Sequence, residues 1–205
     1  MGLVKSRRLP DETLPPPAVD VDVLLARLGD PVATERRKAA FALAVLPDTG
    51  LALCDRLVIE TDDAVREAIL TALMKQPSPL VVERLVSCLA SDHAALRNGV
   101  LAVLRTIPHL VGGHIDRLLA DADPDVRLMT VSLVSGLADP RAPEWLARVA
   151  ADDLDVNVCA NALEGLAEIG GPEAEPAILA AKTRFAGEPF LTFVADTVLA
   201  RIGRR

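Results

Sequence analysis

Apolar residues recur every three to four positions from residue 21 to residue 202, in short blocks separated by Gly, Pro or Asp. This spacing is typical of amphipathic helices, because positions i, i+3, i+4 and i+7 share one helix face. The turns between blocks are short, which favours antiparallel hairpins. We therefore predict six helix pairs, at 21–28 with 34–46, 51–59 with 63–74, 79–90 with 94–105, 113–120 with 124–137, 143–151 with 154–169, and 172–183 with 189–202.

The second helices of successive pairs open on a common motif, in which an apolar residue precedes an arginine. Arg66, Arg97 and Arg127 lie 31 and 30 residues apart, and the same spacing leads back to Arg36 and forward to Asn157. A period of this length indicates stacked helical units that bury their apolar faces against one another. The predicted fold is an all-α, right-handed α-solenoid of about six antiparallel helix pairs over residues 21–205.

The residues at the start of the predicted helices fit this division. An Asp carboxylate can accept the free amide hydrogens of a first helical turn, and Pro at the first position loses no hydrogen bond there. We expect these roles for Asp63, Asp92, Asp123, Pro79, Pro143, Pro172 and Pro189.

The repeated segments resemble the HEAT-repeat family, in particular the short bacterial type found in phycobilin lyases. The resemblance rests on Asp63-Ala64-Val65-Arg66 with Ala72-Leu73, on Asp92 with Leu96-Arg97 and Val103-Leu104, and on Asp123-Pro124-Asp125-Val126-Arg127 with Leu133. It implies a ladder between neighbouring units, formed by Asp63, Arg66, Asp92, Arg97, Asp123 and Arg127. Asn157 replaces the arginine in the fifth unit and the sixth has no counterpart, so we expect the ladder to end toward the C-terminus.

Composition narrows the class of partner. Hydrophobic residues make up 51% of the chain and aromatic residues only 2%, which suits close helix packing better than base stacking. The net charge of −7 argues against a nucleic-acid surface. Charged residues interrupt every apolar run before the roughly 20 residues that cross a bilayer. Residues 1–20 contain a basic cluster and three consecutive prolines but no signal-like apolar segment, so we predict a flexible arm on a cytoplasmic protein.

The sequence carries no recognisable catalytic or metal-binding constellation. Cys54, Cys88 and Cys159 lie inside helical apolar patterns and are interpreted as small buried hydrophobes. His109 and His114 lack the spacing of metal ligands. The His-Glu dipeptides of HEAT-like proteins that resemble deoxyhypusine hydroxylase are absent, as are nucleophile and phosphate-loop motifs. We expect no enzymatic activity, no cofactor and no metal.

One face of the second helices is the predicted partner-binding surface, because in solenoids of this type these helices line the concave side. Helical spacing places nine residues on it, polar at the ends of the array and apolar in the middle: Glu67, Leu70, Met74, Asn98, Leu101, Arg105, Leu128, Val131 and Glu164. A contiguous apolar patch commonly marks an interaction site. The alternative is that curvature or the N-terminal arm covers these side chains.

We therefore predict a monomeric adaptor or scaffold that binds a protein or peptide along this groove. An accessory bilin or cofactor lyase, or a chaperone subunit, is the alternative that the family resemblance raises. Self-association through the last pair is a third hypothesis. It competes with an interpretation of Phe185, Phe190 and Phe193 as an apolar plug that closes the stack.

Overall fold

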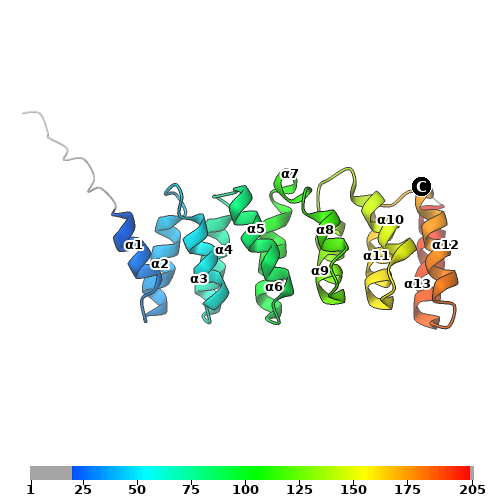
Figure 1. Ribbon diagram of the computed structural model, residues 1–205, viewed down its shortest axis with the longest axis horizontal. Helices are drawn as coiled ribbons and strands as arrows, with labels where there is room; N and C mark the ends of the chain where they lie inside the picture. Colours follow the sequence, from blue (N-terminus) through cyan, green and yellow to red (C-terminus); the bar gives the residue numbers. More distant parts are fainter. Residues whose placement is uncertain (1–19, 204–205) are drawn as a thin grey trace, which may run out of the picture.

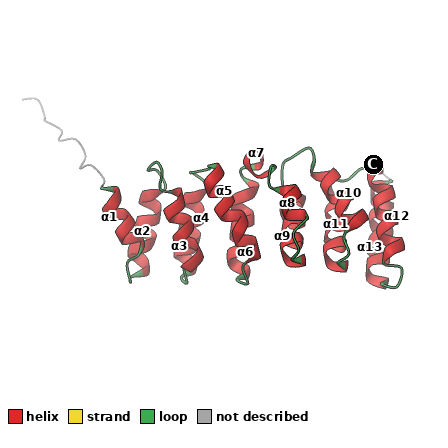
Figure 2. Ribbon diagram, in the orientation of Figure 1, coloured by secondary structure: helices red, strands yellow, loops and turns green. Residues whose placement is uncertain are grey.

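The computed structural model describes residues 20–203, and all regular structure among them is helical. The helices form a row of antiparallel pairs that runs from α1 at one end to α13 at the other (Figures 1 and 2). The predicted all-α solenoid is confirmed. The proposed flexible arm falls almost entirely within residues 1–19, outside the described part of the chain.

The helices follow the predicted blocks closely, and the six pairs are numbered here as units one to six. Units one to three comprise α1 (Val21–Leu28) with α2 (Ala33–Leu43), α3 (Gly50–Ile59) with α4 (Asp63–Leu73), and α5 (Pro79–Ser87) with the 3₁₀ turn η1 (Cys88–Ala90) and α6 (Ala94–Arg105). Units four to six comprise α7 (Pro108–Val111), α8 (Ile115–Leu119) and α9 (Pro124–Ser135), then α10 (Ala142–Asp152) with α11 (Val156–Ile169), and η2 (Pro172–Ala174) with α12 (Glu175–Arg184) and α13 (Pro189–Ile202).

Unit four differs from the prediction, because its first helix is broken into two short helices. Helix α7 was not predicted, and α8 begins at Ile115 rather than at residue 113. Pro108 is accommodated at the first position of α7, where its missing amide hydrogen costs nothing. Gly112 and Gly113 then separate the two helices. The combination of Pro108 and two glycines is typical of a turn, which explains why no helix was predicted here.

Side chains cap several helices as expected, with two shifts of one residue. The carboxylate of Asp123 accepts the amide of Asp125 at 2.9 Å, which confirms its predicted role. Asp62, not Asp63, caps α4 through the amide of Val65 at 3.0 Å. His93, not Asp92, caps α6 through its Nδ1 and the amide of Leu96 at 3.2 Å. Both shifts are within the usual uncertainty of helix ends.

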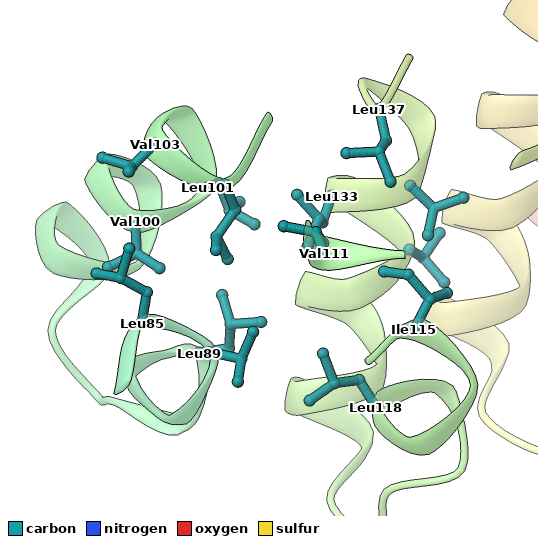
Figure 3. Close-up of a cluster of buried hydrophobic side chains, with 14 of the residues drawn as sticks. Leu85, Leu89, Val100, Leu101, Val103, Val111, Ile115, Leu118, Leu133 and Leu137 are labelled. Carbon is teal, nitrogen blue, oxygen red and sulfur yellow. The ribbon is translucent and has the colours of Figure 1, made fainter. Parts of the chain in front are cut away.

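The core runs as one continuous layer between the helices of each unit and between adjacent units. Figure 3 shows this layer where unit three meets unit four, with Leu101 of α6 directed toward Leu133 of α9 and Val111 of α7. Leu133 and Val111 are completely buried. Because each unit contacts only its neighbours, stability is built from a series of such junctions.

The arginine of each second helix has a regular role within its own unit. Arg36, Arg66, Arg97 and Arg127 each donate to the backbone carbonyl six residues earlier, at 2.9, 2.9, 2.5 and 3.0 Å. That carbonyl lies where the first helix ends, and its oxygen has no helical partner. The arginine therefore closes the end of the first helix and fixes the turn within the unit.

Among the described residues, none of Asp63, Asp92 and Asp123 forms the implied ion pair with an arginine of a neighbouring unit, and other carboxylates take that place. Arg36 pairs with Glu60 at 2.7 Å and Arg127 with Asp153 at 2.8 Å, each across a unit boundary. Asp63 instead pairs with Arg66 inside its own unit. The acidic partners thus lie at the end of the following first helix, not in the predicted turn positions.

Unit five lacks the arginine, and unit six supplies a replacement. Arg184 of α12 donates to the carbonyls of Ala150 and Ala151, the former at 2.7 Å. Ala151 lies six residues before Asn157, so its carbonyl is the one that an arginine at position 157 would reach. The end of α10 is therefore closed from the neighbouring unit.

Candidate protein-binding site

The surface of the second helices contains most, but not all, of the residues predicted to bind a partner. Glu67, Asn98, Arg105, Glu164 and Met74 are exposed, the last with 39% of its surface accessible. Arg105 is also engaged in the fold, because it donates to the carbonyl of Ser132 at 2.5 Å and links units three and four. The polar positions of the predicted groove and one of its apolar positions, Met74, are therefore accessible.

The prediction of an accessible apolar middle is wrong for four of its residues. Leu101 and Val131 are buried, with 6% and 0% of their surface exposed, and Leu70 and Leu128 are half-buried against the core. Leu70 packs over Gly99 of α6, where an added Cβ atom would clash with it. These side chains join neighbouring units and are not available as an anchor for a partner.

The error arises from the helix positions assigned to the outward side. The prediction placed there the residues three positions after Glu67 and Asn98, namely Leu70 and Leu101. Three residues turn a helix by about 300° and four by about 40°, so only the latter returns to the outward side. Thr71 and Ala102, four residues after Glu67 and Asn98, are the exposed residues. Helix α6 lies between α4 and α9, and their approach covers the side that carries Leu101.

A different surface combines exposed apolar side chains with a cleft. It lies on the edge formed by the turns between units, where α2 leads into α3 and α4 leads into α5 (Figure 1). We call it the edge cleft. Its volume is about 700 Å³, and it is lined by Ala44, Val45, Leu46, Pro47, Asp48, Gly50, Leu51, Lys75, Gln76, Pro77, Ser78, Leu80 and Val81.

The apolar lining of the edge cleft is accessible. Val45 is 75% exposed, Leu80 is 64% exposed and Leu51 is 39% exposed. These residues come from three different elements, namely the turn after α2, the start of α5 and the start of α3. Periodicity within a single helix could not bring them together, which is why the sequence did not indicate the site. Their convergence is typical of an interaction surface.

Hydrogen bonds hold the backbone of the edge cleft in place. The side-chain amide of Gln76 donates to the carbonyl of Leu43 at 2.6 Å and to the Thr49 hydroxyl oxygen at 2.8 Å. Thr49, which is 3% exposed, donates to the same carbonyl of Leu43 at 2.9 Å. Asp48 takes a positive φ of 59°, which non-glycine residues rarely adopt. The cleft is therefore preformed, and a partner would not need to order it.

A buried and strongly stabilised charge, Glu60, lies at the boundary of units one and two. Its side chain is fully buried and accepts hydrogen bonds from Arg36, Arg56 and the amides of Thr61 and Asp62. Burial alone would raise the pKa of Glu60, but the bonds from Arg36, the Asp62 amide and Arg56 outweigh it and lower the pKa to about 2. The group remains ionised and structural, and no sequence motif marks it.

The thiols do not offer a reactive group. Cys54, Cys88 and Cys159 are all buried and free, as the sequence predicted. Burial raises the pKa of Cys54 to about 12 and also raises the pKa values of the other two. Thiolate, the nucleophilic form, is scarce at such values. Within residues 20–203, no cluster of His, Cys, Asp and Glu could hold a metal ion.

The last unit does not contain the predicted apolar plug. Phe190 and Phe193 project from α13 with 63% and 70% of their surface exposed, while Phe185 is half-buried. The core of unit six is built instead from aliphatic residues such as Leu191 and Val198. The aromatic residues therefore form part of an uncovered surface.

Fold and surface together define a helical-repeat solenoid with an apolar cleft on one edge. The model of the PBS lyase HEAT-like repeat matches residues 158–183, which cover most of α11 and α12. This segment thus resembles the PBS lyase HEAT-like repeat, in agreement with the resemblance predicted from the sequence. The match falls in units five and six, where the Asp and Arg pattern was expected to fade.

Two solved structures are similar over nearly the whole chain. A designed armadillo repeat protein, YIII(Dq)4CqI, shares 15% identity with a TM-score of 0.38, covering 89% of this chain and 100% of its own. The complex of CpcE and CpcF of phycocyanin lyase from Nostoc sp. PCC7120 shares 18% identity with a TM-score of 0.38, covering 96% and 100%. No curated protein matches the sequence. No helix within residues 20–203 is long and apolar enough to span a membrane.

Proposed function

We propose that this protein is a non-catalytic adaptor that binds a protein partner through the edge cleft of units one to three. The observation that carries the proposal is the convergence of Val45, Leu51 and Leu80 around a preformed cleft of about 700 Å³. Such a cleft accommodates a few apolar side chains of a helix or an extended segment. The partner surface thus moves from the predicted groove to the edge of the array.

The rim of the edge cleft can select the partner's orientation. Asp48 and Lys75 lie on its lining with opposite charges, and neither forms an ion pair with a described residue. Polar groups around an apolar centre typically supply specificity, and the apolar centre supplies most of the binding energy. We expect a partner segment with apolar residues flanked by charges of both signs.

The proposal is tested with a photo-crosslinking amino acid placed at position 45 in the cells that express the protein. A protein captured there is then purified, and its affinity is measured for the wild type and for the double variant Val45→Asp, Leu80→Asp. We expect at least tenfold weaker binding by this variant. Val58→Asp is the matched control, because Val58 is 60% exposed and lies outside the cleft. Equal affinities of all three proteins would refute the proposal.

The second candidate function is an accessory subunit of a bilin or cofactor lyase. The match of residues 158–183 to a PBS lyase repeat favours this role more directly than it favours a general adaptor. Such a subunit would also bind a protein, so the edge cleft serves either role. The difference is a chromophore, which an adaptor does not require.

A titration of free bilin separates the two candidates. For a lyase subunit, the visible absorption of the bilin shifts and gains intensity when the purified protein is added. For an adaptor, the spectrum of the bilin equals that in buffer. The test is repeated after the captured partner is added, because a lyase subunit can require the assembled complex.

A further inference from the structure

Helix α13 carries an exposed stripe with the spacing of a coiled-coil seam. Phe190, Phe193, Thr197 and Ala200 are separated by three, four and three residues, and all four are exposed. Alternation of three and four residues keeps a stripe in register with a partner helix. The opposite side of α13 carries the buried residues Leu191, Val194, Ala195, Val198 and Ile202. The stripe is therefore a second apolar face on a helix whose first face is already buried.

The polar groups in and beside the stripe are satisfied within the chain. The Thr197 hydroxyl donates to the carbonyl of Phe193 at 2.9 Å. Asp196 pairs with Lys182 of α12 at 2.5 Å, and Arg201 pairs with Glu168 of α11 at 2.9 Å. A partner that covers the stripe would not leave these groups without a bond. The free-energy cost of removing water from this surface is therefore small.

The position of α13 explains why the stripe is uncovered. Each interior second helix packs between two others, as α11 does between α9 and α13. Within residues 20–203, α13 has α11 on one side and no second helix on the other. Terminal units normally present a polar outer face. Phe190 and Phe193 instead expose a large apolar surface here, which indicates that a binding partner covers it.

The order of residue sizes along the stripe is self-complementary. Two large side chains, Phe190 and Phe193, are followed by two small ones, Thr197 and Ala200. When a second copy of α13 runs antiparallel, Phe190 faces the second copy's Ala200 and Phe193 faces its Thr197. A two-fold axis makes both halves of such a contact identical. Large residues then fill the space that small ones leave, as close packing requires.

We propose that the protein forms a two-fold symmetric dimer through antiparallel pairing of α13. A head-to-tail contact with α1 fits less well, because the exposed side of α1 carries Asp22 and Arg27 beside Val23. Repetition of that contact would also produce an open-ended chain of molecules. The dimer is independent of the proposed function, since the edge cleft lies in units one to three. One helix face is small compared with the roughly 800 Å² per partner of a standard interface, so association is weak and reversible.

Sedimentation velocity of the full chain at concentrations from about 1 to 300 µM tests the proposal. We expect a monomer–dimer equilibrium with a dissociation constant on the order of 10 µM, as befits a small interface. Phe193→Asp should weaken it by more than thirtyfold, and Ala200→Phe, which fills the space for Phe190, by about tenfold. Leu154→Asp is the matched control, because Leu154 is 82% exposed in the turn before α11. Circular dichroism of each variant verifies that the helices are retained.

Disulfide formation between engineered cysteines tests the antiparallel geometry. A mixture of Phe190→Cys and Ala200→Cys proteins should form a mixed disulfide under mild oxidation, and neither protein should crosslink to itself. The three native cysteines are buried and do not interfere. A monomer at 300 µM, or a dimer that Phe193→Asp leaves intact, would overturn the proposal. Self-crosslinking of the Phe190→Cys protein would overturn the antiparallel arrangement.

Discussion

Replacement of Glu60 by glutamine measures how strongly units one and two are coupled. The carboxylate is buried and receives bonds from Arg36, Arg56 and two backbone amides. Glutamine keeps the shape but removes the charge and places an NH₂ group against donors. The pKa of the Glu60 carboxyl group is about 2, compared with an ordinary value of 4.5. This difference corresponds to about 3 kcal/mol of stabilisation of the ionised form. Breaking a buried ion pair costs a similar amount, about 3–5 kcal/mol.

The assay is urea unfolding followed by circular dichroism, for the wild type and Glu60→Gln between pH 7 and pH 2. A carboxyl group whose pKa is lowered by folding stabilises the protein fully above the pKa of the unfolded state. This contribution is lost as the pH falls from about 4.5 to about 2. At pH 7 the variant should therefore be about 3 kcal/mol less stable, and the difference should shrink toward pH 2.

Other carboxylates do not obscure this result. The pKa values of Asp139 and Asp153 are also lowered by their arginine partners, so both proteins lose some stability in acid. Subtraction of one unfolding curve from the other removes this common part and isolates Glu60. A stability difference that stays constant from pH 7 to pH 2 would refute the assignment, as would a difference below about 1 kcal/mol, the value of an exposed pair.

Three further experiments test the packing between units. Arg184→Ala should lower stability by about 1–3 kcal/mol, because the carbonyls of Ala150 and Ala151 each lose a charge-assisted hydrogen bond. Asn157→Arg should restore part of the loss in a double-mutant cycle of urea unfolding. Gly165→Val should lower the melting temperature by several degrees, because the added atoms would clash with the side chains of Ser135 in α9 and Leu146 in α10. An unchanged melting temperature would contradict this close approach of the helices. The double variant Leu101→Asp, Val131→Asp should lose its helical circular dichroism, since it buries two carboxylates, and a folded variant would show that these positions are surface.

The sequence predicted the helices well because each carries its own signal. Apolar spacing places α6 at 94–105 and α13 at 189–202, and both were found with those bounds. The signal fails at α7, where Pro108 and the two glycines after it have the composition of a turn. The local sequence therefore sufficed to predict the long helices, but not a four-residue helix whose residues are also typical of a turn.

The candidate site was less predictable, because exposure depends on the neighbouring unit. Leu101 and Ala102 are adjacent on one helix, yet α9 covers only the former. The edge cleft combines residues from three elements, and Glu60 gains its partners across a unit boundary. Relations of this kind depend on how units stack. A repeat period reveals that they stack, but it does not give the relative rotation of two helices.

The contact between Arg184 and the end of α10 limits how this array can be cut or extended. In units one to four, the arginine that closes a first helix belongs to the same unit, so each of these pairs can be duplicated or transplanted with its own closure. Unit five depends on unit six for this bond. A chain truncated after α11 would lose the closure of α10 together with the last pair. Units five and six therefore form a single module, and insertions that lengthen the array are best tolerated before it.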